Sequence, residues 1–117
     1  MRVLVCGGRY FSNWLWLCKV LDELNPAFVI HGEAKGADQG AWIWAWVRDV
    51  PYRGYPADWG RYGYNAGPKR NLQMLLDGKP DLVVAFPGGH GTANMVKIAR
   101  EAGVPVLIPT LDLELPE

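Results

Sequence analysis

The sequence predicts an α/β fold: a Rossmann-like three-layer αβα domain built on a mainly parallel five-stranded sheet. The first observation is an unbroken apolar run, 82–86, which is typical of a parallel strand buried on both faces. The second is that this run enters a glycine-rich turn, after which Met95, Ile98, Ala99 and Ala102 recur at helical spacing. The third is that strand-like and helix-like segments alternate along the chain, which implies right-handed crossovers and a parallel sheet.

The remaining elements follow in order along the chain. Further strands are predicted over 3–6, 28–31, 52–55 and 104–108. Helices are predicted from a cap at Ser12 or Asn13 to about residue 24, over 37–49, over 68–77, and from the glycine turn to about 102. Between the third strand and third helix, a long loop is expected over 56–67, and the acidic tail after Pro109 is expected to be loosely held.

Glycine and proline mark the expected boundaries of several elements. Pro68 suits the first position of the third helix, because a missing N–H costs nothing there. Gly78 and Gly103 are expected to end the third and fourth helices. Pro105 cannot donate a ladder hydrogen bond, so it suits an edge strand or the start of a strand better than a central position.

Composition predicts a single globular domain over residues 1–117. Half of the residues are apolar, 21% are charged and the formal net charge is zero, so a broad basic face for nucleic acid is disfavoured. Cys6 and Cys18 form no metal-binding pattern and suggest free thiols in a reducing compartment. No signal-peptide pattern or apolar run near the ~20 residues of a membrane span is found. We therefore expect a cytoplasmic protein with neither metal nor cofactor.

Glycine follows three of the predicted strands, and parallel strands all end at one edge of their sheet. Ligands of such sheets bind beyond that edge, where the strand order reverses. Outward-facing amides and a helix N-terminus suit an anion there, most often a phosphate. The residues expected to converge on this site are Gly7, Gly8, Arg9, Gly32, Pro87, Gly88, Gly89, His90, Gly91 and Thr92. The 88–92 spacing is neither a Walker nor a dinucleotide pattern, Gly7-Gly8-Arg9 could be only a tight turn, and Thr92 could also cap a helix.

Several side chains are candidates for ligand contacts near these turns. Lys69 and Arg70 lie in the predicted first turn of a helix, where a cation opposes the helix dipole unless an anion is close. Arg70 is therefore expected to neutralise the anion, although a solvated arginine would look the same. Asn71 and Asp38 are candidates for ribose or base contacts, and Asp38 could equally be a helix N-cap. His31, at the end of a predicted strand, suits a core position, with a ligand contact as the alternative.

The predicted helix over 37–49 carries three tryptophans at alternate positions. Helical spacing places Trp42 and Trp46 on one face and Trp44 on another. A helix that is apolar all round must be covered on both sides. Burial in the core explains one face, and a subunit interface explains the other. The sequence thus predicts a homo-oligomer. Trp59, in the loop, could stack on a base or anchor the loop.

Taken together, these motifs resemble one family. Their order and spacing are similar to those of the YspA/YpsA-related SLOG family, within the superfamily of DprA and the Lonely-guy proteins. The segments that carry the resemblance are 7–11, 31–38, 56–59, 66–71 and 87–92. The resemblance implies a Rossmann-like fold with a nucleotide or nucleotide-derived ligand where the first and fourth strands end.

The resemblance also defines the alternative functions. Lonely-guy enzymes hydrolyse the N-glycosidic bond of nucleoside monophosphates, and their glycine turn is followed by a glutamate where this chain has Met95. A thioether can neither carry charge nor move a proton, so Asp38, Asp58 or Glu33 would have to substitute, with Arg70 as a further catalytic candidate. We therefore expect a sensor or sequestering module for a nucleotide-derived small molecule. An N-glycoside hydrolase is the alternative, and DprA-like single-stranded DNA binding is a weaker one.

Overall fold

The computed structural model describes residues 1–110; the end of the predicted acidic tail, 111–117, lies outside the described residues. Five parallel strands form one sheet in the order β3-β2-β1-β4-β5, which confirms the predicted fold class. The strands are β1 (Arg2–Cys6), β2 (Phe28–His31), β3 (Tyr52–Gly54), β4 (Leu82–Ala85) and β5 (Val106–Leu107). The direction of strand order reverses between β1 and β4, so this edge is where a ligand is expected.

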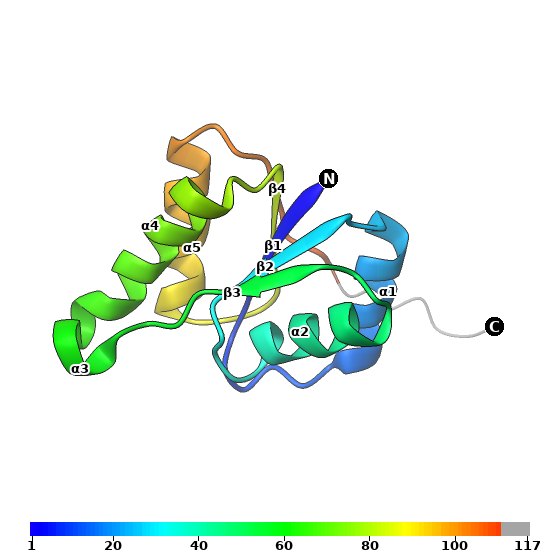
Figure 1. The fold of residues 1–117 in the computed structure, drawn as a ribbon, viewed down its shortest axis with the longest axis horizontal. Coiled ribbons are helices and arrows are strands. Elements are labelled where there is room, and N and C mark those ends of the chain that lie inside the picture. The colour runs from blue at the N-terminus through cyan, green and yellow to red at the C-terminus, as the bar shows by residue number, and fades with distance from the viewer. Residues whose placement is uncertain (111–117) are drawn as a thin grey trace.

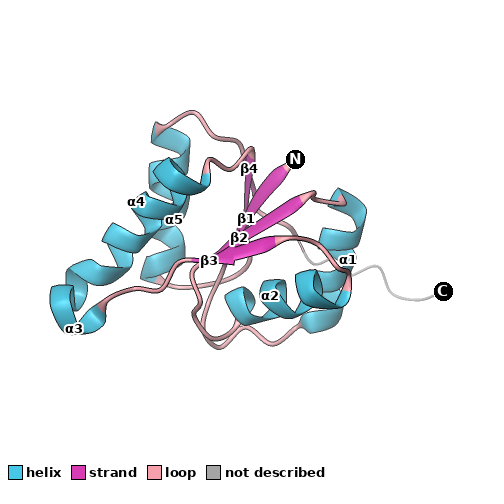
Figure 2. Ribbon diagram, viewed as in Figure 1, coloured by secondary structure: helices cyan, strands magenta, loops and turns pink. Residues whose placement is uncertain are grey.

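Helices cover both faces of the sheet (Figures 1 and 2). One face packs against α1 (Trp14–Leu24) and α2 (Ala37–Val47), through residues such as Leu17, Leu21 and Trp44. The other face packs against α4 (Ala66–Gly78) and α5 (His90–Glu101), through Met74 and Met95. Within residues 1–110, no helix has the length and apolar character needed to cross a membrane.

The central strands β1, β2 and β4 are mostly apolar because each of them contributes to both cores. In β1, Val3 and Val5 belong to the core under α1 and α2, whereas Leu4 and Cys6 belong to the core under α4 and α5. Side chains alternate between faces along a strand, so burial of both faces removes the polar alternation seen in half-exposed strands. The unbroken 82–86 run follows the same rule, with Val83 on one side and Val84 on the other.

Most predicted boundaries agree with the structure. The side chain of Asn13 caps α1 by accepting the Trp16 N–H at 3.2 Å, and Asn25 ends that helix in the left-handed conformation. Gly103, with φ of 76°, follows the end of α5. β5 is an edge strand, one of the positions that Pro105 suits, although it spans only two residues.

The segment between β3 and α4 differs from its prediction. The expected loop contains α3 (Trp59–Tyr62), capped by Asp58, and a 3₁₀ turn (Gly63–Asn65) that continues directly into α4 at Ala66. Pro68 is therefore the third helical residue, where its missing N–H still has no intrahelical partner to lose. Gly78 is the last residue of α4, and Lys79 takes the left-handed position after it.

The tryptophans of α2 divide between two faces, as predicted. Trp44 is buried, and its indole N–H donates to Asp22 at 2.9 Å. Trp42 and Trp46 lie on the exposed face, with 41% and 70% of their surface accessible. We call the exposed residues Trp42, Ile43, Trp46 and Val47 the tryptophan face. Whether a second subunit covers this face stays a prediction.

Candidate functional site

Glycine allows the turns after β1 and β4 and the start of α2 to pack backbone against backbone. The Gly8 N–H donates to the Pro87 carbonyl at 2.8 Å, and the Gly8 carbonyl accepts the Ala37 N–H at 3.2 Å. A Cβ on Gly88 would collide with Thr92 and lie 2.6 Å from the Gly8 nitrogen. A Cβ on Gly36, which has a φ of 81°, would collide with the Gly8 carbonyl. Gly8 and Gly88 are thus explained by packing alone.

These turns border a hollow of about 450 Å³, which we call the glycine hollow. Its walls come from the β1 turn, the β2–α2 loop, α4 and the start of α5. The predicted site residues that line it are Gly7, Gly8, Arg9, Asp38, Arg70, Asn71, Gly89, His90, Gly91 and Thr92. Gly32, Pro87 and Gly88 do not line it, and Pro87 and Gly88 instead line a separate cavity between β4 and α5. The structure thus brings Arg70 and the 88–92 turn to a common cavity.

The N-terminus of α5 is open toward this hollow. Gly89 is the N-cap residue, and no side chain from the described residues caps the helix. A Cβ on Gly89 or Gly91 would have no neighbour within 4 Å, and neither residue has a positive φ. Packing and backbone conformation therefore do not require glycine at these two positions. The first-turn amides, with the positive end of the helix dipole, are available to an anion.

Arg70 projects from the second turn of α4, one turn later than predicted, because the helix begins at Ala66. Its Nη1 donates to the carbonyls of Gly32 and Tyr55, and its Nε donates to the Asn71 side chain at 3.0 Å. These bonds fix the guanidinium group in a half-buried position. Of its five N–H donors, the two on Nη2 have no partner within residues 1–110. The side chain is therefore held by the protein with one nitrogen still free.

Asp38 is not the N-cap of α2, a position that Gly36 occupies. Its carboxylate instead accepts the N–H groups of Gly32 at 2.9 Å and Ala34 at 3.4 Å, which closes the loop before the helix. Burial raises the pKa of Asp38 to about 6, with the charge of Arg70 and the two amides opposing the rise. Gly32 lies between these side chains, since a Cβ there would clash with the Arg70 guanidinium and lie 2.8 Å from the Asp38 carboxylate.

Asn71 holds α4 against the start of α5. Its Nδ2 donates to the Gly91 carbonyl at 3.1 Å and to the Asn94 side chain at 3.0 Å, while its Oδ1 accepts from Arg70. The residue is buried, and these bonds use both of its amide hydrogens. A direct ribose or base contact by Asn71 would thus cost existing bonds. Asn71 therefore fixes the position of Arg70 relative to the first turn of α5.

The other candidates divide between the rim of the hollow and sites away from it. Arg9 and His90 are exposed at the rim, beside Trp59 and Tyr64, and Tyr64 had no sequence signal to single it out. Asp58 caps α3 by accepting the Arg61 N–H at 3.1 Å and does not line the hollow.

Three other features bear on the chemistry of the site: Met95, the thiol of Cys6, and the absence of a metal-binding cluster from the described residues. Met95, at the family glutamate position, is fully buried in the core. Cys6 lines the hollow, but burial raises the pKa of its thiol to about 12, which keeps it protonated near neutral pH. Within residues 1–110, no group of three or more His, Cys, Asp or Glu side chains could hold a metal ion.

This fold and hollow define a class: a Rossmann-like α/β domain with an open helix N-terminus and an arginine at the carboxyl edge of its sheet. Residues 1–62 match the YspA, cpYpsA-related SLOG family (YAcAr), and the chain belongs to that family. It is 37% identical over 118 residues to the Gene 61 protein of Mycobacterium phage D29, covering 91% of this chain and 94% of that protein.

The fold is also similar to a solved structure, DNA processing protein A (DprA) from Streptococcus pneumoniae. The TM-score is 0.74 and the sequence identity 20%. The similarity covers 97% of this chain and 52% of the DprA chain, so this chain spans about half the length of DprA.

Proposed function

We propose that this protein binds a nucleotide or nucleotide-derived ligand, as a sensor or sequestering module, with the ligand's phosphate in the glycine hollow. The observation that carries the proposal is the pair Gly89 and Gly91, two glycines that neither packing nor backbone conformation requires. Absence of a Cβ there leaves room for an anion to approach the first-turn amides of α5. The free Nη2 of Arg70 adds a positive charge in the same hollow.

Direct binding measurements test this proposal. We expect at least one of AMP, GMP, CMP and UMP to bind more tightly than its nucleoside in isothermal titration calorimetry. Arg70→Gln should weaken that binding about tenfold or more, because a charge-assisted contact to phosphate is lost. Arg61→Gln is the matched control: it removes the same charge from exposed α3, outside the hollow, and should change affinity less than about twofold.

Two outcomes would count against the proposal. Equal affinity of the parent for nucleosides and their monophosphates would exclude a phosphate-recognising site. An equal loss of affinity in the Arg61 and Arg70 variants would indicate that both residues act only through long-range electrostatic attraction and that Arg70 makes no direct contact with the phosphate. Because Arg70 also supports the Gly32 and Tyr55 carbonyls, Thr92→Val serves as a second variant that leaves those bonds intact.

An N-glycoside hydrolase is the second candidate function, and Asp38 is the observation that favours it. This carboxylate lines the hollow, and its pKa of about 6 suits proton transfer near neutral pH. Chromatographic detection of free base after incubation with nucleoside monophosphates would support it, provided that Asp38→Asn abolishes release. If the nucleotide stays intact after prolonged incubation, the hydrolase is excluded and the binding module remains the proposed function.

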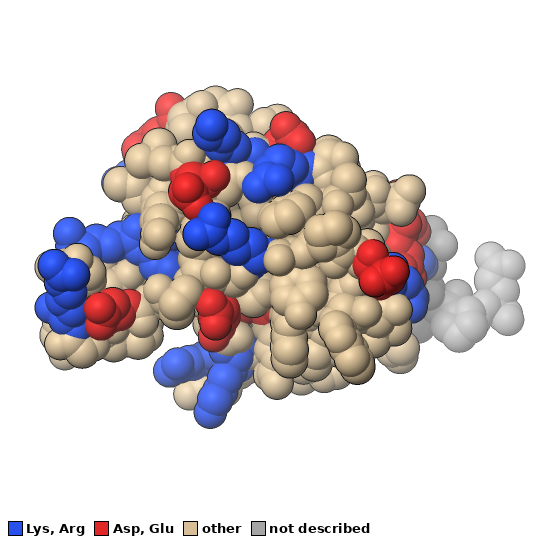
Figure 3. Space-filling model, viewed as in Figure 1, with Lys and Arg blue, Asp and Glu red and all other residues tan. Residues whose placement is uncertain are grey.

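DNA binding has weaker support. The similar fold of DprA, whose name denotes DNA processing, motivates the comparison. On the face drawn in Figure 3, however, Lys and Arg are interspersed with Asp and Glu, and the net charge is zero. A polyanionic strand is held chiefly by clustered cations, so we expect no salt-sensitive retention of a single-stranded oligonucleotide.

We further propose that the part of the tryptophan face formed by Ile43, Trp46 and Val47 mediates self-association. Trp46 and Val47 have 70% and 58% of their surface accessible, and Ile43 lies beside them on the same helix. A contiguous exposed apolar patch of this kind marks an interaction surface. For the protein's location we propose the cytoplasm, since the free thiols of Cys6 and Cys18 fit a reducing compartment.

A further inference from the structure

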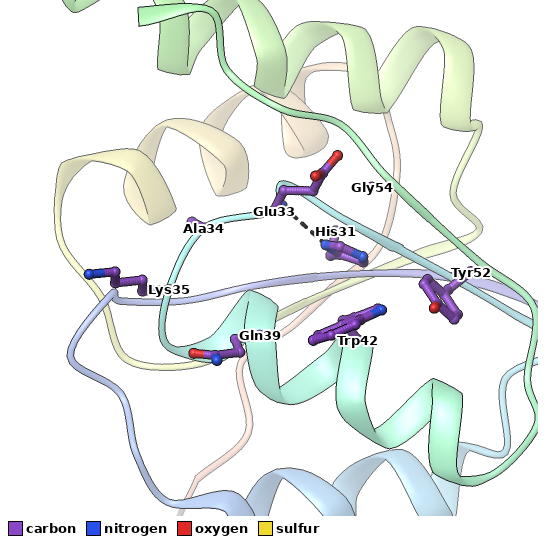
Figure 4. Close-up of a pocket in the computed structure, with 8 residues that line it drawn as sticks. All are labelled: His31, Glu33, Ala34, Lys35, Gln39, Trp42, Tyr52 and Gly54. Atoms are coloured by element: carbon purple, nitrogen blue, oxygen red, sulfur yellow. Dashed lines mark hydrogen bonds between the residues drawn. The ribbon is translucent and has the colours of Figure 1, made fainter.

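A second cavity, which we call the aromatic pocket, lies beyond the ends of β2 and β3, beside α2 (Figure 4). Its volume is about 590 Å³. In Figure 4, the rings of His31, Trp42 and Tyr52 gather at one end, and Gln39 and Lys35 lie at the other. Ala34, in the β2–α2 loop, lines both this pocket and the glycine hollow, so the two cavities are neighbours along one edge of the sheet.

His31 has an unused hydrogen-bonding atom at this pocket. The residue is 4% exposed, and its Nδ1 accepts the Glu33 N–H at 3.1 Å. Burial, and then the charge of Arg70, lower the pKa of His31 to about 4, so the ring is neutral. With Nδ1 acting as an acceptor, the single ring hydrogen must be on Nε2. That Nε2 is buried and has no partner among the residues that the structure describes.

A buried donor without an acceptor is costly, and native structures rarely keep one without a reason. The surrounding backbone carries a further cost: Glu33 adopts a left-handed conformation, with φ of 56°. This conformation places the Glu33 side chain over Gly54, where a Cβ would collide with it. The loop thus holds the Glu33 carboxylate at the rim, next to the aromatic end of the pocket.

The aromatic end offers surfaces on which a flat ring can stack. Tyr52 lies 6.0 Å from His31 and 6.5 Å from Trp42, measured between ring centroids, with interplanar angles of 36° and 72°. Trp42 and Tyr52 are each more than a third exposed, so their rings are accessible from solvent. Aromatic side chains beside a few polar groups are the usual receptor for an unstacked nucleobase.

We propose that the aromatic pocket holds the nucleobase of the ligand, with a base carbonyl or ring nitrogen accepting the hydrogen of His31 Nε2. Gln39 and Glu33 also line the pocket and supply further polar groups around the ligand. This inference rests on the proposed function, in which the glycine hollow holds the phosphate. Strands β2 and β4 are separated by β1, so the ends of these two strands lie about 10 Å apart. An extended nucleotide spans that distance from its phosphate to the far edge of its base.

The test compares each of AMP, GMP, CMP and UMP with ribose 5-phosphate, a probe that has phosphate and sugar but no base. Dissociation constants are measured by calorimetry on the full chain. We expect at least one nucleotide to bind the parent about tenfold or more tightly than ribose 5-phosphate. His31→Asn keeps an acceptor for the Glu33 N–H but has no donor at the Nε2 position. This variant should bind that nucleotide about fivefold to tenfold more weakly than the parent does, and its affinity for ribose 5-phosphate should be unchanged.

Rescue and control variants separate recognition from structural damage. His31→Gln can place an amide N–H near the Nε2 position and should recover part of the lost affinity. Trp42 lies on the surface of α2, and Trp42→Ala should lower the affinity for the nucleotide about tenfold, because the stacking surface is removed. Trp46→Ala is its matched control: it removes the same ring one turn along the helix, outside the pocket, and should leave the affinity unchanged.

The outcomes distinguish this inference from the function on which it rests. If His31→Asn and Trp42→Ala bind every nucleotide as tightly as the parent does, the base lies elsewhere and the inference is wrong. Binding of ribose 5-phosphate would in that case still support the phosphate site of the proposed function. Equal losses in Trp42→Ala and Trp46→Ala would also overturn it. If neither ribose 5-phosphate nor any of the four nucleotides binds the parent, the proposed function fails and this inference fails with it.

Discussion

Replacing Gly91 with alanine should separate ligand binding from folding. Gly91 is the second residue of α5, and an added Cβ would meet no atom within 4 Å. Alanine is a better helix former than glycine, so the free energy of unfolding should rise by up to about 1 kcal/mol. The new methyl group would occupy space through which we expect the phosphate to approach. A loss of about tenfold in affinity, about 1.4 kcal/mol, is the expected result.

Gly88→Ala is the control, because the same methyl group has a different environment three residues earlier. There the Cβ would collide with Thr92 and lie 2.6 Å from the Gly8 nitrogen. Overpacking of this kind costs about 1–3 kcal/mol, so this variant should be less stable than the parent. Urea unfolding followed by tryptophan fluorescence gives the stabilities, and calorimetry with ribose 5-phosphate gives the affinities. The reasoning would be refuted by a Gly91 variant that binds as well as the parent, or by one that loses stability as Gly88→Ala does.

Four further predictions concern His31, Asp38, Gly32 and Trp46. Between about pH 4 and 6.5 the unfolded chain binds more protons than the folded chain at His31, whose pKa is about 4, so the stability of the parent relative to His31→Gln should rise with pH by about 3 kcal/mol. For Asp38, whose pKa is raised to about 6, the folded chain binds more protons than the unfolded chain between pH 4 and 6. The free energy of unfolding of the parent, relative to that of Asp38→Asn, should therefore fall by about 3 kcal/mol over this range. If urea unfolding shows the same pH dependence of stability for the His31 and Asp38 variants, both predictions are wrong. Gly32→Ala should destabilise the fold by about 1–3 kcal/mol and lower the thermal midpoint, because its methyl group would be forced against Arg70; an unchanged midpoint would mean that the guanidinium can move aside freely. Trp46→Glu should shift the protein to monomer in sedimentation velocity without changing the far-ultraviolet spectrum, and a parent that is already monomeric at high concentration would remove the self-association proposal.

The features predicted from sequence are those that local pattern determines. Apolar runs such as 82–86 mark strands buried on both faces, and Asn13, Asn25 and Gly103 mark helix ends, because each needs only its own neighbours to act. The four-residue helix α3 was missed because it is too short to leave a helical period, and without it the start of α4 was placed at Pro68 rather than Ala66.

The site was predicted as a set of turns, but its internal bonding depends on contacts between distant segments. Asp38 was a candidate for a ribose or base contact, with a helix N-cap as the alternative, and only the fold shows that its carboxylate turns back to the Gly32 and Ala34 amides. The sequence singled out His31 and Trp42 but gave no sign that they meet Tyr52 in one pocket, since the three residues come from separate elements. Conversely, the glycines looked alike in sequence, and the space around each one distinguishes packing glycines from those facing a cavity.

The central claim is that an anion binds the first-turn amides of α5, and nitrogen-labelled protein tests it most directly. In amide ¹H–¹⁵N spectra recorded during titration with ribose 5-phosphate, the largest and saturable shifts should fall on Gly89, His90, Gly91 and Thr92. Arg70, which also lines the hollow, should show a smaller shift of its side-chain Nε–H. Shifts confined to other parts of the chain, or none at saturating ligand, would contradict the account.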